Sequence, residues 1–199
     1  PDLVLLPGTK NTMDDLRWLR ESGMEAAVLK HASAGGAVIG ICGGYQIMGR
    51  SVSDPHGVEG DPRTVPGLGL LPVETVLTTG KVTRQVEFSF LGGTELCKGY
   101  EIHMGDTVIT GDATPVNLMS SGQPDGCMTD DRCMGSYIHG ILDNDCVIRH
   151  ILSQCGAALT DVTATDYAAW RDSQYDALAD ALRRHLDMEA IYKIMCGDD

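Results

Sequence analysis

The sequence that decides the fold is AVIGICGGYQIMG, at positions 37–49 of this 199-residue chain. Its apolar beginning predicts a short buried strand, its glycine-rich middle predicts a sharp turn, and the remainder predicts a helix. Gly40 and Gly44 flank Cys42 in a Gly-x-Cys-x-Gly pattern. Glycines suit such a turn because its backbone is strained and larger neighbours would crowd the residue at its tip. The pattern is therefore typical of a nucleophile elbow that carries cysteine.

Cys42 is the candidate nucleophile. At the predicted start of a helix its sulfur lies near the positive end of the peptide dipoles, so we expect a stabilised thiolate and a lowered pKa. The alternative is a small buried cysteine in a glycine-rich turn, which is the commoner situation for an isolated cysteine. The flanking glycines, with a strand before them and a helix after them, favour the catalytic interpretation.

Composition indicates an ordinary globular protein. Hydrophobic residues make up 43% of the chain and charged residues 22%, and the length suits one domain. The 15 Lys and Arg against 28 Asp and Glu give a formal charge of −13, which argues against nucleic acid and anionic membranes as partners. The seven cysteines form no CxxC pair and no zinc-type cluster, so we expect reduced thiols and no metal. Without a signal peptide or a bilayer-spanning run, we expect a cytoplasmic protein.

The N-terminal third predicts alternating strands and helices. An apolar run before the first Pro-Gly turn suits a buried strand, and Thr12 with Asp15 resembles a helix capping box. Gly23 suits the end of that helix, and a second helix is expected over residues 24–32. With the strand that begins at Ala37, this order is typical of a largely parallel sheet with helices on both faces.

The middle third predicts mostly antiparallel β-structure after a surface loop over residues 51–69. Two alternating segments are expected to pair as a hairpin around Thr79-Gly80-Lys81. Weaker, shorter strands follow, punctuated by Gly, Asp and Pro. We therefore expect an antiparallel β extension beside the parallel sheet. The expected strands are 72–79, 82–90, 100–104, 107–109, 116–119 and 126–128.

The last third predicts a strand over residues 135–140 that finishes on His139. A helix is expected to follow from Asp143 or Asn144 to about residue 154. The tail, from residue 166 to about residue 195, is expected to be helical. The apolar residues of its buried side are expected to form core or an interdomain contact; they are Tyr167, Trp170, Leu178, Leu182 and Leu186.

A thiolate nucleophile needs a base that takes its proton and later protonates the leaving amine, and imidazole does both near neutral pH. His139 is the best candidate among six histidines, because it ends a predicted strand before a glycine, at the sheet edge where α/β sites lie. His103 ends another strand and is the second choice. The remaining histidines are expected on the solvated surface: His31, His56, His150 and His185.

Four motifs follow one another along the chain. They are PDLVLLPGTK at 1–10, GICGGYQ at 40–46, GYEIHMG at 99–105 and GSYIHG at 135–140. Together they resemble the glutaminase domain of the cobyric acid synthase family, in the cobyric/cobyrinic branch of the class I glutamine amidotransferases. The resemblance covers nearly the whole chain. It implies a flavodoxin-like α/β fold, with a mixed, largely parallel sheet, an antiparallel β extension and a helical C-terminal tail.

The resemblance also implies hydrolysis of L-glutamine. Cys42 would attack the side-chain amide, and His139 would act as general base and acid. The backbone N–H groups of Gly43, and of Gly8 or Thr9, would form the oxyanion hole, which suits amides at a helix start and a glycine turn. The residues expected to bind glutamine are Gln46, His103 and Met104. From spacing alone, Gln46 could equally be a polar residue on a partly exposed helix, and Met104 could equally be a core residue.

Ile141 stands where most class I glutaminases carry a glutamate that orients the histidine. The resembled branch also lacks that glutamate, so we expect a Cys-His dyad. The cost is modest for cysteine, because a thiolate needs less help from its base than an alkoxide does. Glu101 and Asp143 are both candidates to orient His139 in its place.

Partners are implied by the same resemblance. The ammonia would feed an N-terminal synthetase domain that uses ATP and Mg to activate corrinoid carboxylates in cobalamin biosynthesis. The overall reaction would convert adenosylcobyrinic a,c-diamide to adenosylcobyric acid. This chain has no Gly-x-x-x-x-Gly-Lys-Ser/Thr motif and begins, without Met, directly in a predicted strand. We therefore expect it to be the glutaminase part of a longer enzyme, with no cofactor of its own.

Several alternatives stay open at the level of sequence. Within the same class, the chain resembles the glutaminase of a cobyrinic acid a,c-diamide synthase or of a complex that amidates lipid II. A cysteine peptidase of the same fold would use the same elbow and histidine, although Gln46 and the order of the motifs favour glutamine. A non-catalytic scaffold is a further alternative, because Ile141 occupies the orienting position.

Overall fold

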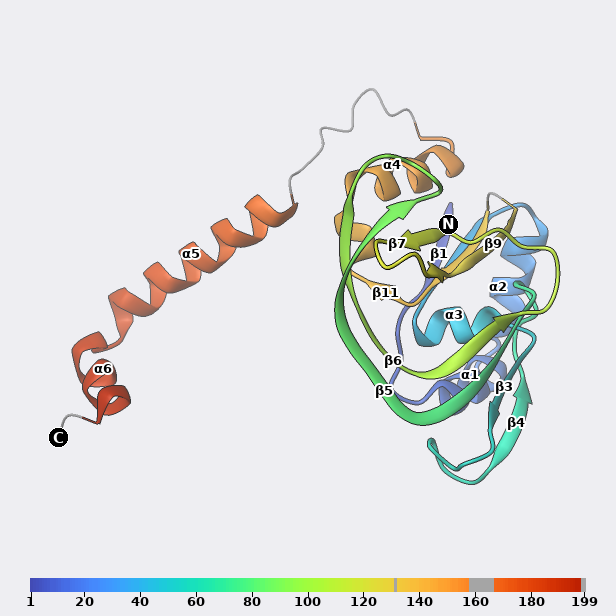
Figure 1. Cartoon of the computed structure of the whole chain (residues 1–199), viewed down its shortest axis with the longest axis horizontal. Helices are drawn as coiled ribbons and strands as arrows, with labels where there is room; N and C mark the ends of the chain where they lie inside the picture. The colour runs from blue at the N-terminus through green and yellow to red at the C-terminus, as the bar shows by residue number, and fades with distance from the viewer. Residues whose placement is uncertain (131, 158–166, 198–199) are drawn as a thin grey trace. The chain divides into compact units, whose positions relative to one another are not determined.

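The computed structural model describes residues 1–130, 132–157 and 167–197. The chain divides into two units, Pro1–Val162 and Thr163–Asp199. The first unit holds two sheets together with the helices α1 to α4 (Figure 1). The α/β class predicted from the sequence is confirmed.

The first sheet has the strand order β1-β2-β10-β9. The first three strands run parallel, and β9 is antiparallel to β10. The register sets Gly40 of β2 beside both Leu6 and Gly135. The carboxyl ends of three parallel strands therefore meet where β2 leads into Cys42, and the predicted largely parallel sheet is confirmed. The bounds are β1 Leu3–Leu6, β2 Ala37–Ile41, β9 Cys127–Asp130 and β10 Cys133–Ser136.

Helix α1 (Thr12–Glu21) begins one residue before the predicted capping box would place it. Its N-cap is Asn11, whose side chain accepts a hydrogen bond from the Asp14 N–H at 2.9 Å. The box of Thr12 and Asp15 is therefore a wrong prediction. The asparagine oxygen satisfies a free N–H of the first turn, and Thr12 is the first helical residue.

The next two helices follow the predicted order. Gly23 takes a left-handed φ of 81° between α1 and α2 (Met24–Ser33), a conformation that favours glycine. Helix α3 (Gly43–Met48) is buried along its whole length and packs against strands of both sheets. Cys42 thus stands between β2 and a helix that lies in the centre of the first unit.

The second sheet has the order β11-β6-β5-β3-β4, with β7 paired to β5 and β8 paired to β7. Its centre is the long antiparallel pair of β5 and β6, which curves around the front of the first unit in Figure 1. β3 runs parallel to β5, and the other pairings given for this sheet are antiparallel. The predicted antiparallel extension is thus confirmed as a separate sheet. The bounds are β3 Ser51–Asp54, β4 Arg63–Pro66, β5 Val73–Phe90, β6 Cys97–Ile109, β7 Asn117–Met119, β8 Pro124–Asp125 and β11 Ile138–His139.

Three predictions within this sheet are wrong. The strands expected separately over residues 100–104 and 107–109 form the single strand β6. Strand β5 continues through Thr79-Gly80-Lys81 without a hairpin, and only its register shifts between Val76 and Lys81. Polar residues occur there because this part of the strand is exposed, so a composition typical of a turn does not indicate one. β3 and β4 pair inside the expected loop over residues 51–69, because four-residue strands carry too little apolar alternation to be recognised.

The strand predicted over residues 135–140 is divided between the two sheets. Its first half belongs to β10, which ends at Ser136 in the first sheet. Its second half is β11, which pairs His139 with Tyr100 in the second sheet. The chain crosses from one sheet to the other at Tyr137. The predicted histidine is therefore held by the sheet next to that of the nucleophile.

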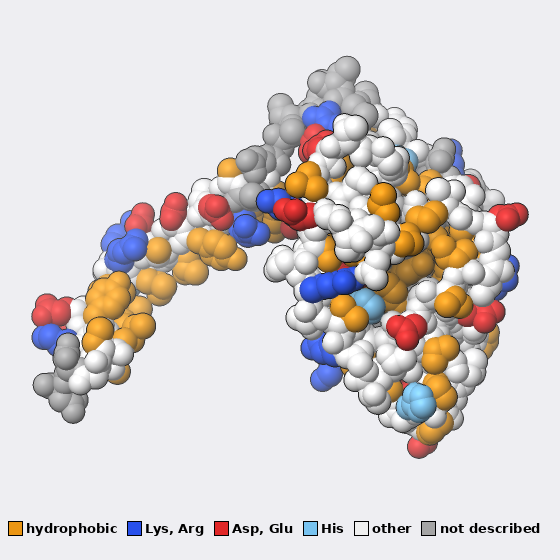
Figure 2. Space-filling view, viewed as in Figure 1, with side chains coloured by type: hydrophobic (Ala, Val, Ile, Leu, Met, Phe, Trp, Pro, Cys, Tyr) orange, Lys and Arg blue, Asp and Glu red, His pale blue; other side chains and the backbone are white. Residues whose placement is uncertain are grey.

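A short 3-10 turn at Ile141–Asp143 precedes α4 (Asp145–Gln154), close to the predicted helix. The second unit contains α5 (Tyr167–His185) and α6 (Met188–Cys196), so the predicted helical tail is confirmed. Hydrophobic side chains gather along α5 in Figure 2. Tyr167, Trp170, Leu178, Leu182 and Leu186 are each at least 37% exposed, so the expected core is not observed, and the expected interdomain contact stays a prediction. No described helix combines the length and apolar character that crossing a membrane requires.

Candidate active site

Cys42 occupies the strained turn that the sequence predicts. Its φ of 53° and ψ of −111° are rarely adopted by L-residues, and such a conformation costs about 1–3 kcal/mol. A Cβ on Gly40 would lie 2.7 Å from the Gly44 carbonyl, and one on Gly44 would lie 1.9 Å from the Leu6 oxygen. Neither glycine can carry a side chain. The predicted strand, glycine-flanked turn and helix are thereby confirmed.

A cavity of about 680 Å³ lies at this turn, within the usual size range of small-molecule sites. Its wall is formed by Cys42 and by residues of the β1–α1 loop, α1, α3, the β3–β4 loop, β5, β6 and the end of β11. The cavity brings together most of the side chains that the sequence analysis singled out. Those that line it are Gly8, Thr9, Cys42, Gln46, His103, Met104 and His139. Those that are not among its lining residues are Gly43, Glu101 and Asp143.

Gly8 lies between the nucleophile and the histidine. A Cβ built on Gly8 would lie 3.1 Å from His139 Cε1 and 3.5 Å from Cys42 Cβ. Cys42 and His139, which are far apart in the sequence, therefore approach the same point of the β1–α1 loop. The space beside these two side chains exists because residue 8 carries no side chain of its own.

We expect the Gly8→Ala variant to hydrolyse glutamine with a kcat lowered about 10- to 100-fold, because the added methyl group displaces the His139 ring. Its thermal midpoint should change little, since the backbone at Gly8 is not left-handed. The control is Gly80→Ala, where a Cβ would meet nothing within 4 Å. Equal activity of both variants in an ammonia-release assay would show that residue 8 does not define the gap.

His139 is neutral at pH 7. Burial lowers its pKa, because a ring removed from water disfavours the charged form; a hydrogen bond to the Ile102 carbonyl opposes this shift and the nearby His103 adds to it. The ring stacks on Tyr100 with centroids 5.0 Å apart. Nε2 is buried and has no hydrogen-bond partner among the described residues. An unpartnered buried nitrogen is unfavourable in a merely structural residue, whereas a general base needs one.

The Ile102 carbonyl is the group that both candidate residues share. His139 is hydrogen-bonded to it, and the Cys42 Sγ donates to it at 3.6 Å. Glu101, one of the two candidates for orienting the histidine, instead pairs with Arg84, and its Oε1 lies 3.7 Å from the Nε2 of His103. A backbone carbonyl thus contacts the His139 ring. Asp143, the other candidate, places its Oδ2 beside Gly140.

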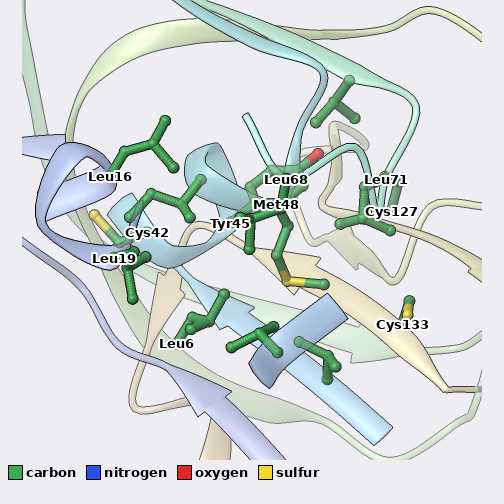
Figure 3. Close-up of a cluster of buried hydrophobic side chains, with 14 of the residues drawn as sticks. Leu6, Leu16, Leu19, Cys42, Tyr45, Met48, Leu68, Leu71, Cys127 and Cys133 are labelled. Atoms are coloured by element: carbon green, nitrogen blue, oxygen red, sulfur yellow. The ribbon is translucent and has the colours of Figure 1, made fainter. Parts of the chain in front are cut away.

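The expected lowering of the Cys42 pKa is contradicted by the structure. Burial raises the pKa, because the thiolate would lose its water, and a hydrogen bond from the Gly43 N–H offsets this only in part. Figure 3 shows the side chain close to Leu16 and Leu19, in one cluster of buried residues. Helix α3 is six residues long, so its dipole is small. Cys42 therefore rests as a thiol that must be deprotonated during the reaction.

Backbone amides meet beside the sulfur. A Cβ on Gly43 would lie 2.3 Å from Thr9 Cγ2 and 3.0 Å from Thr9 N, so the turn after Cys42 and the β1–α1 loop are in direct contact. The Gly43 N–H already points towards the Cys42 sulfur. This position agrees with the oxyanion hole expected from Gly43 together with Gly8 or Thr9, which stays a prediction until a bound substrate or inhibitor is observed.

Gln46 is 3% exposed and its amide is fully engaged by the protein. Its Oε1 accepts a hydrogen bond from the Thr12 hydroxyl at 2.8 Å. Its Nε2 donates to the Met104 carbonyl at 3.2 Å and to the Tyr137 hydroxyl at 3.1 Å. Gln46 therefore links α1, β6 and the crossing point between the sheets, and both of its N–H groups are used before any substrate binds.

Tyr137, which the sequence analysis did not single out, does not line the cavity but contacts Gln46, which does. Its ring stacks on His103 with centroids 3.9 Å apart, and burial raises the pKa of its hydroxyl to about 12. It stays protonated at neutral pH and holds Gln46. Its place two residues before His139 is a signal that could have identified it, whereas the carbonyl of Ile102 carries no signal in the sequence.

Solved structures define the class to which this fold belongs. A structure described as a glutamine amidotransferase matches with a TM-score of 0.58 and 20% identity, over 78% of this chain and 80% of that one. The structure of PurLQS from Thermotoga maritima matches with a TM-score of 0.53 and 15% identity, over 77% and 78%. The chain has the fold of the class I glutamine amidotransferases.

The sequence comparison identifies the family. Residues 1–147 match the CobB/CobQ-like glutamine amidotransferase domain, and the chain belongs to this family. Cobyric acid synthase of Phocaeicola vulgatus is 50% identical over 200 residues, covering 100% of this chain and 40% of that protein. Cobyric acid synthase of Caulobacter sp. is 45% identical over 194 residues, covering 97% and 39%. The chain thus spans about two-fifths of the length of these curated relatives, and the resemblance drawn from four motifs is confirmed.

Proposed function

We propose that this chain hydrolyses L-glutamine with Cys42 as nucleophile and His139 as general base. The observation that carries the proposal is the single cavity in which a strained, glycine-flanked cysteine meets a neutral histidine whose Nε2 has no partner among the described residues. Deprotonation of the thiol requires both residues. The thiol needs a base because its pKa is raised, and the base is available because its own pKa is lowered.

The reaction would proceed through a thioester. His139 Nε2 takes the Sγ proton as the sulfur forms a bond to the amide carbon, and the carbonyl oxygen becomes an oxyanion facing the N–H groups of Gly43 and of Gly8 or Thr9. The protonated ring then gives the proton to the leaving nitrogen, and the C–N bond breaks to release ammonia. Water attacks the thioester with His139 again as base, which yields glutamate and regenerates the thiol.

The ammonia would be used in an amidation. Relatives of nearly 50% identity are cobyric acid synthases that extend well beyond this chain. We propose that a synthetase domain, which binds ATP and Mg, accepts the ammonia and converts adenosylcobyrinic a,c-diamide to adenosylcobyric acid. The names of these relatives favour this reaction over the amidation of cobyrinic acid or lipid II.

The protein should release ammonia and glutamate from glutamine in equal amounts. Incubation with a glutamine-mimicking electrophile should block this reaction and modify Cys42, as mass spectrometry of the digested protein would reveal. Casein serves as the control substrate. Cleavage of casein without ammonia from glutamine would favour the cysteine peptidase, and an unmodified, inactive Cys42 would favour the scaffold.

A further inference from the structure

The active-site cavity contains charged side chains that the hydrolytic step does not use. Besides the nucleophile and two histidines, its ionisable lining residues among the described part of the chain are Lys10, Glu59 and Lys81. Free glutamine carries an ammonium group and a carboxylate at the end remote from its amide. The cavity therefore offers one acidic and two basic groups to a substrate that needs both kinds of partner.

Glu59 is held in place before any substrate arrives. It lies in the loop between β3 and β4, where Asp54 accepts hydrogen bonds from the backbone N–H groups of Val58 and Glu59 at 2.8 and 2.7 Å. Its own Oε2 accepts from the Met13 N–H at 3.0 Å, at the first turn of α1, where a negative charge is favoured. Its Oε1 has no hydrogen bond to a described residue, so one carboxylate oxygen is available to a ligand.

Lys81 lines the cavity from the second sheet, whereas Lys10 lines it from the β1–α1 loop. Lys81 belongs to β5, at the end of the irregular register, and is paired there with Met104 of β6. No described acidic residue lies within ion-pair distance of its Nζ or of the Nζ of Lys10. Lys10 directly follows the part of the β1–α1 loop that contacts Cys42. It therefore lies near the end of the cavity where the substrate amide would react. Lys81 is therefore the better placed of the two lysines for the remote end of a substrate.

We propose that Glu59 binds the α-ammonium group and Lys81 the α-carboxylate of glutamine. This inference rests on the proposed function and deepens it. The two contacts select free glutamine, because a glutamine within a peptide has neither charge and would leave both side chains without a partner. They act equally on the bound substrate and on the transition state, since both α-groups are remote from the reacting amide. Their loss is therefore expected in KM and not in kcat.

The test compares Glu59→Gln and Lys81→Met with the unmodified protein on three substrates. These are glutamine, glutaramic acid, which lacks the α-amino group, and 4-aminobutanamide, which lacks the α-carboxylate. Each variant should raise the KM for glutamine about 10- to 100-fold with kcat nearly unchanged. Glu59→Gln should no longer distinguish glutamine from glutaramic acid, and Lys81→Met should no longer distinguish glutamine from 4-aminobutanamide. The side-chain amide introduced by Glu59→Gln still has an oxygen that can accept a hydrogen bond from the Met13 N–H, so the β3–β4 loop should stay in place.

Lys10→Met is the matched control, because it removes a lysine from the same cavity and should preserve discrimination between all three substrates. The inference fails if Glu59→Gln and Lys81→Met weaken all three substrates by the same factor, which would indicate a structural role. It also fails if neither variant changes the KM for glutamine. An unmodified protein that does not hydrolyse glutamine would instead contradict the proposed function.

Discussion

Replacing Cys42 with alanine is expected to lower kcat for glutamine hydrolysis by about 10⁴-fold or more, because no thioester can form. The amides that face the cavity would stay in place, so the variant should still bind glutamine with an affinity close to that of the unmodified protein. Ammonia release measures the first effect, and isothermal titration calorimetry measures the second. Together the two measurements distinguish a variant that cannot react with glutamine from one that cannot bind it.

Cys133→Ala is the matched control for this experiment. Like Cys42, Cys133 is a buried cysteine, at 8% exposure; it lies in β10 of the first sheet and does not line the cavity. We expect its activity to be unchanged and its stability to fall modestly, as for other truncations in a core. Cys42→Ala with activity within tenfold of the unmodified protein would refute the assignment of the nucleophile.

The His139→Asn variant is expected to lose about 10²- to 10⁴-fold in kcat, the usual contribution of a general base. Its pH profile should change as well. The base works only when neutral, so activity falls as the pH drops through the pKa of His139. Burial places that pKa below the ordinary value of 6.5, so the midpoint of the acidic fall in activity of the unmodified protein should lie below pH 6.5.

His103→Asn provides the comparison, because His103 lines the same cavity and was the second choice as base. This variant should retain the acidic limb of the kcat/KM profile, whereas His139→Asn should lack it. If the limb disappears in His103→Asn and persists in His139→Asn, the two histidines have been assigned the wrong way round.

The sequence predicted those features of the candidate site that depend on the local backbone. The glycines on either side of Cys42 are needed because two backbone segments leave no room for a Cβ, and this requirement is visible in the sequence itself. His139 could be predicted as well, since a strand that ends on histidine and glycine places the ring at a sheet edge. Both predictions depend on a few neighbouring residues.

Features that depend on the tertiary structure could not be predicted. The hydrogen bonds of the Ile102 carbonyl to Cys42 and His139 involve a backbone group that every residue has. The pKa of Cys42 was predicted with the wrong sign because burial outweighs the short helix and the Gly43 N–H, and burial is known only from the packed structure. The place of Glu59 at the cavity was hidden because the loop expected over residues 51–69 contains two strands too short to recognise.

The central claim is that the sulfur of Cys42 attacks the glutamine side chain while His139 takes its proton. Rapid acid quenching of the protein during turnover, followed by peptide mass spectrometry, tests this claim most directly. We expect a γ-glutamyl thioester on the peptide that contains Cys42, formed much more slowly in His139→Asn and absent in Cys42→Ala. A glutamyl adduct on another residue, or undiminished turnover in Cys42→Ala, would contradict the account.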